Sequence, residues 1–228
     1  MSSLSSIAVF GSLSKAELAL LERSMLILEP QNGEEIFAQG DVADAVYAII
    51  SGDGHVRIGA VDRRSRALMV EVFDIGDIFG EIGVIDGRVR TAGAIAEGRL
   101  RLARINASAF LDALSSAPKL GEAVCRLLAG RLRRTSELFQ DAAFETLEVR
   151  LARQILYLIA HESRQTHQGL QLIRRLRQSD LADLLGATTR SIITILNSWR
   201  AKDLVIYNTD TALLTVRDKA ALQAIIDG

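Results

Sequence analysis

Between residues 25 and 105 the chain is divided into short apolar segments, and this division most restricts the possible fold. The segments are separated by glycine and aspartate, for example at Gly40-Asp41 and at Ser51-Gly52. Many short strands separated by turns are typical of a β-sandwich or barrel. We therefore predict strands at residues 25–28, 35–37, 45–50, 55–61, 67–73, 92–96 and 100–105.

Helical patterns flank this β-rich region. Ser14 and Glu17 have the spacing of a capping box. Asn106 and Thr146 are placed to cap two further helices, and Pro118 suits the first turn of a long one. The predicted helices span residues 14–25, 107–115, 118–144 and 146–162, and a short strand is predicted at residues 170–176 after a polar stretch at 161–168.

The long helix predicted at residues 118–144 carries apolar side chains at spacings of three and four. Such a stripe suits a two-stranded coiled coil. The alternative is that it packs on the chain's own β-region, and we expect both arrangements, at opposite faces of the helix. The apolar positions are Leu120, Val124, Leu127, Leu128, Leu132, Leu138 and Ala142.

Composition limits the class of protein. At 228 residues with 49% hydrophobic content, the chain suits one large or two small domains. It has no run of 18 apolar residues, no signal-peptide pattern at its start, and one cysteine, so we expect a cytoplasmic protein without an internal disulfide. Residues 1–145 hold 16 Lys and Arg against 20 Asp and Glu, whereas residues 146–228 hold 11 against 8. The positive C-terminal part hints at a polyanionic partner.

Residues 78–96 contain groups suited to a nucleotide. Gly80 and Gly83 allow the backbone to come close to a ligand. Arg90 is a planar donor fork suited to a phosphate, and Thr91 adds a hydroxyl beside it. Glu81 only accepts hydrogen bonds, which suits a sugar hydroxyl. The set favours a ligand with a ribose and a phosphate; the alternative is a glycine-rich turn with a surface Arg and Glu.

Residues 177–204 have the spacing of two short helices with a shared core. The first must end in a tight turn at Gly186, and Thr188 is placed to cap the second. This pattern is typical of a helix-turn-helix, although an ordinary helical hairpin is the alternative. Residues 204–207 and 212–216 are predicted to form a two-stranded wing. The shared core is predicted to contain Leu181, Leu184, Leu185, Ile192, Ile195, Leu196 and Trp199.

The ordered residues Phe79-Gly80-Glu81 and Arg90-Thr91-Ala92 resemble the phosphate-binding cassette of cyclic-nucleotide-binding domains. With the helix-turn-helix, they make nearly the whole chain similar to the cyclic-AMP receptor protein / fumarate–nitrate reduction regulator (Crp/Fnr) family of bacterial transcription factors. The resemblance implies an α+β fold with an N-terminal β jelly roll, a long dimerisation helix and a C-terminal winged helix-turn-helix. It also implies a homodimer, with double-stranded DNA and RNA polymerase as partners. The implied domains are residues 1–116, 117–145 and 146–228.

A second motif narrows the branch of the family. Residues 131–137 read Arg-Leu-Arg-Arg-Thr-Ser-Glu, and the cyclic-AMP receptor branch carries an Arg and then a Thr-Ser pair on its long helix. The resemblance implies that Thr135 bonds the purine in its own subunit and that Ser136 reaches the nucleotide of the partner subunit. Arg131 would pair with Glu81 or approach the phosphate. The implied ligand residues are Phe79, Gly80, Glu81, Ile82, Arg90, Thr91, Ala92, Arg131, Thr135 and Ser136.

Other ligands of this family fit the sequence less well. An iron–sulfur cluster requires several cysteines, and the chain has one, Cys125. His55 is the only histidine in the β-rich region, which argues against haem. We therefore expect cyclic AMP as the allosteric ligand, with cyclic GMP as the alternative, and no metal, haem or cluster.

The reading helix departs from the best-known relatives. They carry Arg-Glu early in this helix and an Arg four residues after that Glu, whereas residues 189–194 read Thr-Arg-Ser-Ile-Ile-Thr. The familiar operator is therefore not expected. The wing tip, residues 207–211, also lacks the usual Lys or Arg. We expect Thr189, Arg190 and Thr194 to face bases. Arg177, Ser179 and Arg200 are expected to contact phosphates. The remaining expected DNA-binding residues are Thr188 and Ser191.

These observations predict a cyclic-nucleotide-responsive transcription regulator that binds two-fold operator DNA as a homodimer. The alternative is a cyclic-nucleotide-binding module that regulates a protein partner, and the helix-turn-helix argues against it. An enzyme is not expected, because the sequence shows no Walker loop and no catalytic spacing of nucleophile and base.

Overall fold

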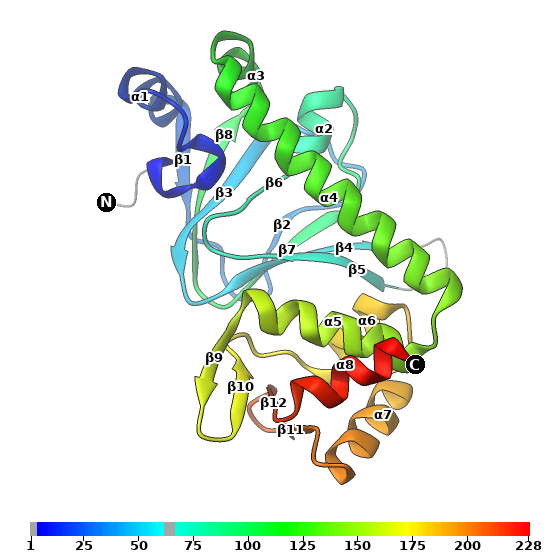
Figure 1. Cartoon of the computed structure of the whole chain (residues 1–228). Coiled ribbons are helices and arrows are strands. Elements are labelled where there is room, and N and C mark those ends of the chain that lie inside the picture. Colours follow the sequence, from blue (N-terminus) through cyan, green and yellow to red (C-terminus); the bar gives the residue numbers. More distant parts are fainter. Residues whose placement is uncertain (1–3, 62–66) are drawn as a thin grey trace. The chain divides into compact units, whose positions relative to one another are not determined.

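The computed structural model describes residues 4–61 and 67–228. The chain divides into two compact units, Met1–Arg134 and Thr135–Gly228. The boundary lies within one long helix, α4 (Pro118–Phe144), drawn in green in Figure 1.

The N-terminal unit is built on two antiparallel four-stranded sheets. One has the order β1-β8-β3-β6 and the other the order β2-β7-β4-β5. Seven of the strands lie within two residues of the predicted positions. The prediction missed β6, because two residues are too short to show an alternating pattern. The strands are β1 (Met25–Leu28), β2 (Glu35–Phe37), β3 (Ala45–Gly52), β4 (His55–Val61), β5 (Ala67–Phe73), β6 (Ile78–Phe79), β7 (Gly93–Glu97) and β8 (Leu100–Asn106).

Strand β3 is buried on both faces and joins two parts of the core. Tyr47 and Ile49 point between the sheets, where they pack with Phe79. Val46 and Ala48 point the other way, toward the helical layer of α1 (Lys15–Ser24), α3 (Ala107–Ser116) and the start of α4. The alternation of successive side chains along the strand explains why its apolar run is continuous.

The predicted helix caps have mixed outcomes. At α1 the capping box is confirmed, since the Ser14 hydroxyl accepts from the Glu17 amide and the Glu17 carboxylate accepts from the Ser14 amide. At α3 the helix begins directly after Asn106, as predicted, but the side-chain cap is absent. The Asn106 Oδ1 accepts instead from Arg104 Nη1 at 2.8 Å.

Helix α4 begins at Pro118, as predicted, and presents two different faces. Leu120 and Val124 are buried against the chain's own β-domain. Leu132 and Phe139 are 69% and 74% exposed. The expected packing of one face on the chain's own β-region is therefore confirmed, and the opposite face is turned to solvent.

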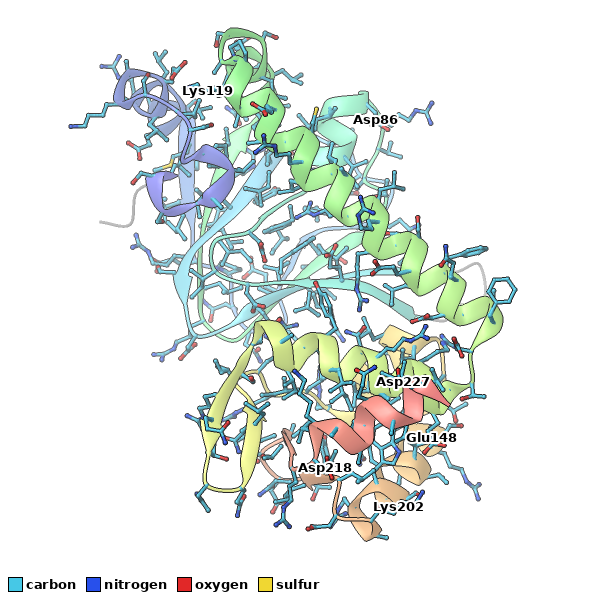
Figure 2. All side chains as sticks on the ribbon, viewed as in Figure 1. Asp86, Lys119, Glu148, Lys202, Asp218 and Asp227 are labelled. Carbon is cyan, nitrogen blue, oxygen red and sulfur yellow. The ribbon has the colours of Figure 1, made fainter. Side chains whose placement is uncertain are left out.

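The C-terminal unit surrounds a separate core. Its sheet has the order β11-β12-β10-β9. Trp199 lies fully buried in this core, and its Nε1 donates to Glu148 Oε1 at 2.8 Å (Glu148 is labelled in Figure 2). The elements are α5 (Leu147–His161), β9 (Ser163–Thr166), β10 (Gly169–Leu172), α6 (Gln178–Leu185), α7 (Thr189–Ala201), β11 (Val205–Asn208), β12 (Leu213–Val216) and α8 (Lys219–Asp227).

Two features of this unit differ from expectation. The polar stretch at 161–168 contains β9, and the strand predicted at 170–176 is the shorter β10. The two strands form a hairpin in which Gln171 accepts from Arg164 across the strands. Polar residues suit a strand when its exposed face is solvated, so this strand gave no apolar signal. The sequence also gave no expectation for α8, although Asp218 caps it.

The end of α4 is attached to α5 by an arginine. Arg153 on α5 donates to Asp141 near the end of α4 and to Glu145 in the connection, the latter at 3.0 Å. Thr146 accepts from the Val149 amide and caps α5, as predicted. In the described part of the chain, no helix has the length and apolar character needed to cross a bilayer.

Candidate ligand and DNA sites

The cassette residues come together around the short helix α2 (Glu81–Asp86). Gly80 precedes it with φ of 78°, a left-handed conformation that favours glycine. A Cβ at Gly80 would lie 2.7 Å from Arg90 Nη1, and one at Gly83 would lie 2.7 Å from Ala43 Cβ. Both glycines are therefore required for the close packing of this turn.

Arg90 lies inside this turn and is only 3% exposed. Its Nη1 donates to the Gly80 carbonyl at 2.6 Å, and its Nη2 donates to the Ala45 carbonyl at 2.8 Å. The Asp44 carboxylate lies 3.5 Å from Nη2, and the guanidinium lies 4.2 Å from the centre of the Phe37 ring. Burial lowers the pKa of Arg90 from its ordinary value, and Asp44 opposes that shift.

One donor of Arg90 is left over. Its Nε is buried and has no hydrogen-bond partner among the residues that the structure describes. An unpaired buried donor costs about 1–3 kcal/mol, more when charged, and therefore calls for an explanation. A cationic donor in a glycine-rich turn has the chemistry to receive an anion.

Glu81 is paired with the long helix. It is 1% exposed, and its Oε1 accepts from Arg131 Nη1 at 2.6 Å. Arg131 also donates to the Ile78 carbonyl at 2.6 Å and lies 4.3 Å from the centre of the Phe73 ring. The sequence suggested that Arg131 pairs with Glu81 or approaches the phosphate, and the pair with Glu81 is present. A carboxylate has several acceptor positions, so Glu81 retains capacity for a further donor.

The other cassette side chains divide into core and surface. Phe79 is fully buried, and its ring stacks on Tyr47 with centroids 5.2 Å apart, so its side chain belongs to the core. Ala92 is 8% exposed. Thr91 and Ile82 are exposed on the surface of the cassette.

A second carboxylate lies near this pair. Burial raises the pKa of the Glu71 carboxyl, an effect that Arg131 opposes and that Asp77 and Glu81 reinforce. Arg131 therefore pairs with Glu81 and also stabilises the charged form of Glu71.

Thr135 and Ser136 follow Arg131 by about one turn on α4, and both are exposed. Side chains three or four apart on a helix lie on adjacent parts of its surface. The helix thus carries the residue that holds Glu81 and the two residues expected to meet a purine in a single short segment.

The helix-turn-helix has the predicted geometry. Gly186 ends α6 with φ of 60°, and Thr188 caps α7 by accepting from the Ser191 amide at 3.2 Å. The Thr188 and Ser191 hydroxyls also share a hydrogen bond of 2.8 Å. Both hydroxyls therefore serve the cap. Ile192 and Leu196 are fully buried in the core of this unit, as predicted.

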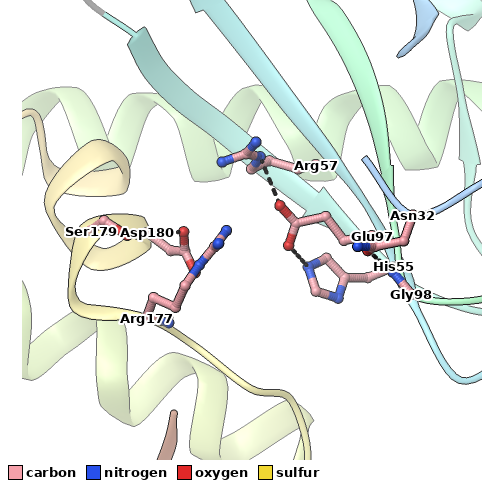
Figure 3. A network of polar contacts seen from close by, with 8 residues as sticks. All are labelled: Asn32, His55, Arg57, Glu97, Gly98, Arg177, Ser179 and Asp180. Carbon is pink, nitrogen blue, oxygen red and sulfur yellow. Dashed lines mark hydrogen bonds and ion pairs between the residues drawn. The ribbon is translucent and has the colours of Figure 1, made fainter. Parts of the chain in front are cut away.

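Two expected phosphate contacts lie at the start of α6 (Figure 3). The Asp180 carboxylate accepts from the Arg177 amide at 2.9 Å and from Arg177 Nε at 3.2 Å. Ser179 Oγ lies 3.5 Å from the same carboxylate. Asp180 thus orients Arg177, whose side chain remains 59% exposed.

Figure 3 also shows His55, the histidine considered as a haem ligand. Its Nε2 lies 3.2 Å from Glu97, and Arg57 Nε lies 3.4 Å from the other oxygen of the same carboxylate. His55 is therefore part of a network of polar contacts on β4 and β7. Within residues 4–61 and 67–228 no group of three or more His, Cys, Asp or Glu is placed to hold a metal ion.

Several residues of the cassette site were not foreseen from the sequence. Asp44, the Ala45 carbonyl and the Phe37 ring all contact Arg90. They lie about 45 to 53 residues before it in the chain. No local pattern marks them, because their contact with Arg90 exists only after the sheets have formed.

A jelly roll with this cassette, followed by a long helix and a helix-turn-helix, defines the class of ligand-regulated DNA-binding proteins. Comparison with known sequences agrees with this class. The family described as "Cyclic nucleotide-binding domain" matches residues 28–117, and that described as "Crp-like helix-turn-helix domain" matches residues 149–225. The chain belongs to the Crp/Fnr family of transcription regulators, a family of regulators rather than enzymes.

Individual relatives support the same assignment. A "CRP-like cAMP-activated global transcriptional regulator" of Mycobacterium tuberculosis is 26% identical over 95% of this chain and 96% of its own length. A "Cyclic AMP receptor protein" of Thermus thermophilus is 28% identical over 88% of each chain. Among solved structures, the c-di-GMP responsive regulator CLP of Xanthomonas campestris has a TM-score of 0.77 at 24% identity, covering 90% of this chain and 100% of that one, and shows the shared fold.

Proposed function

We propose that this regulator binds cyclic AMP in its jelly roll and, as a homodimer, binds two-fold operator DNA in response. The observation that carries the ligand proposal is the unpaired, buried Nε of Arg90. A cyclic phosphate could accept from this nitrogen and from the remaining donors of the guanidinium without displacing the Gly80 and Ala45 carbonyls. A ribose hydroxyl could donate to Glu81 while Arg131 remains bound.

The names of the relatives from Mycobacterium tuberculosis and Thermus thermophilus favour cyclic AMP. Calorimetry of the purified protein with cyclic AMP, cyclic GMP and cyclic di-GMP separates the candidates. We expect one nucleotide per subunit and tighter binding of cyclic AMP. Binding of cyclic di-GMP alone would contradict the proposal, because its two phosphates need a different arrangement of cations.

DNA control is tested by fluorescence anisotropy with a pool of random DNA and with a site selected from it. We expect cyclic AMP to strengthen binding to the selected site, since a ligand shifts an equilibrium only by its differential affinity for two states. DNA affinity that does not depend on the nucleotide would refute the regulatory role. The proposed role also requires access to DNA and to RNA polymerase, from which we infer a cytoplasmic location.

The homodimer proposal rests on the exposed face of α4. Cys125, Ala129, Leu132, Ser136, Phe139 and Ala143 follow one another at alternating spacings of four and three, and all are exposed. This is the heptad spacing of a two-stranded coiled coil. We define these six residues as the α4 seam.

Cys125 offers a direct test of the α4 seam. In a parallel dimer the two copies of a seam residue face each other, which suits disulfide formation. Mild oxidation of the dilute protein should therefore produce a covalent dimer on non-reducing gels. In the Cys125→Ala background, Leu132→Cys should restore the cross-link, whereas Arg126→Cys, on another side of the helix, should react much more slowly. Equal cross-linking of both would reject the seam.

Thr135 and Ser136 are proposed to couple the ligand to the α4 seam. Replacing both by alanine should leave cyclic-AMP binding detectable in calorimetry. It should remove most of the ligand-induced gain in DNA affinity, which in allosteric proteins is typically about 5- to 150-fold. Glu137→Ala, an exposed neighbour on the same helix, is the matched control. A double variant that responds as fully as the control would show that these contacts are not the switch.

A further inference from the structure

The exposed face of α7 carries a residue outside the expected DNA-binding set. Arg190, Thr194 and Asn197 are all exposed and follow one another at spacings of four and three. Residues with this spacing share one face of a helix. We call Arg190, Thr194 and Asn197 the α7 line. The opposite face of the helix is fixed in the core by Ile192, Leu196 and Trp199, which holds the α7 line toward solvent.

The hydrogen bonds of α7 decide which side chains on this line are available. Thr194 Oγ1 donates to the Arg190 carbonyl at 3.0 Å, which uses its hydroxyl within the helix and leaves its methyl group for apolar contact. No hydrogen bond or ion pair of the Arg190 side chain occurs among the described residues. Asn197 Oδ1 accepts one long bond, 3.4 Å, from Arg200 Nη1. Its amide thus remains able to recognise another group.

An exposed asparagine on a reading helix has a specific chemistry. Its amide donates and accepts in the pattern that matches N7 and N6 of adenine in the major groove. Arginine matches guanine, and a threonine methyl matches the thymine methyl. Asn197 lies about 10 Å from Arg190 along the helix axis, from a rise of about 1.5 Å per residue. That distance corresponds to about three base-pair steps of about 3.4 Å.

We propose that Asn197 determines sequence specificity by recognising an adenine about three base pairs from the base that Arg190 reads. The inference rests on the proposed operator binding by α7. The inference is favoured by the wing, because its tip carries no Lys or Arg. The Asn208 side chain at this tip accepts from the Asp210 and Thr211 amides at 3.0 Å each. Discrimination between operators then depends on the α7 line.

The test begins with a half-site selected from random DNA by the full-length protein. Each base pair of that half-site is then replaced in turn, and dissociation constants are measured by anisotropy with and without cyclic AMP. Asn197→Ala should weaken binding to the selected site by about 5- to 150-fold and lose discrimination at one position. Its affinity for scrambled DNA should stay within about twofold. Arg190→Ala should lose discrimination at a different position, about three base pairs away.

Two further variants exclude a general structural effect. Asn197→Asp keeps only acceptors, so its preference at the same position should move from adenine toward cytosine, whose N4 donates. Ser198→Ala, exposed on another side of α7, should leave the whole profile unchanged. Thermal unfolding confirms that each variant is folded.

The outcomes separate the two proposals. An equal loss on all DNAs would assign Asn197 to a phosphate, and an unchanged profile would leave it only the contact with Arg200; either result overturns the inference. Discrimination lost in Arg190→Ala but kept in Asn197→Ala would reject the adenine contact and leave operator reading intact. If cyclic AMP has no effect on any of these measurements, the ligand proposal fails while the base profile still decides the role of Asn197.

Discussion

Replacing Arg90 by leucine should weaken cyclic-AMP binding by about 30-fold or more. The guanidinium is 3% exposed and has a buried, unpaired Nε in the cassette. Removing one partner of a buried charge pair costs about 2–5 kcal/mol, and about 1.4 kcal/mol corresponds to a tenfold change. Calorimetry on the folded variant measures the effect, and an unchanged dissociation constant would place the phosphate elsewhere.

Arg90 also holds two carbonyl groups, so the leucine variant needs a companion. Arg90→Lys keeps the charge but not the planar fork, and should bind the nucleotide more weakly than the natural protein and more tightly than Arg90→Leu. The same ranking should not appear in the melting temperature of the C-terminal unit, because the hydrogen-bond and ion-pair partners of Arg90 within residues 4–61 and 67–228, namely Gly80, Ala45 and Asp44, lie in the jelly roll. Parallel losses of affinity and of global stability would instead mean that Arg90 is structural.

Replacing Arg131 by methionine should lower the free energy of unfolding of the N-terminal unit by about 3–5 kcal/mol. The substitution leaves the Glu81 carboxylate, 1% exposed, without its cation. Breaking a buried ion pair by removing one partner is strongly destabilising, because the remaining charge stays out of water. Urea unfolding followed by circular dichroism measures the loss, while fluorescence of the single tryptophan, Trp199, reports on the C-terminal unit.

Two control variants test whether the loss of stability comes from the buried charge of Glu81. Adding Glu81→Gln to Arg131→Met removes the buried charge and should recover much of the stability. Arg126→Met removes a pair with Glu122 that is exposed on the same helix and should cost about 0.5 kcal/mol or less. Equal losses for Arg126→Met and Arg131→Met would show that the Glu81 pair has no special role.

The charged side chains of the cassette are held in place by contacts within the protein itself. Each charged group is already oriented by the fold: Arg90 by two carbonyl groups and Phe37, Glu81 by Arg131. Groups that are held in place before binding lose less entropy when the ligand arrives. The cassette is therefore preorganised by its own packing.

The sequence by itself determined those features whose cause lies within a few residues. The capping box of Ser14 and Glu17, the start of α4 at Pro118 and the turn at Gly186 are all set by contacts within about one helical turn. Most strands of the jelly roll were also predictable, because alternation and turn residues are local. The order of the cassette residues was readable for the same reason, since Gly80 to Ala92 form one continuous segment.

Only the tertiary structure decided the features that depend on distant neighbours. The Asn106 side chain makes no cap hydrogen bond, and its Oδ1 accepts instead from Arg104, whose other nitrogen donates to Asp44, 60 residues away. Packing on the β-domain decided which apolar positions of α4 are buried, namely Leu120 and Val124, while Leu132 is exposed. Arg90 acquired Ala45 and Asp44 as partners across about 45 residues. Such contacts form when strands far apart in the chain become neighbours in a sheet, and neither propensity nor periodicity in a single sequence records them.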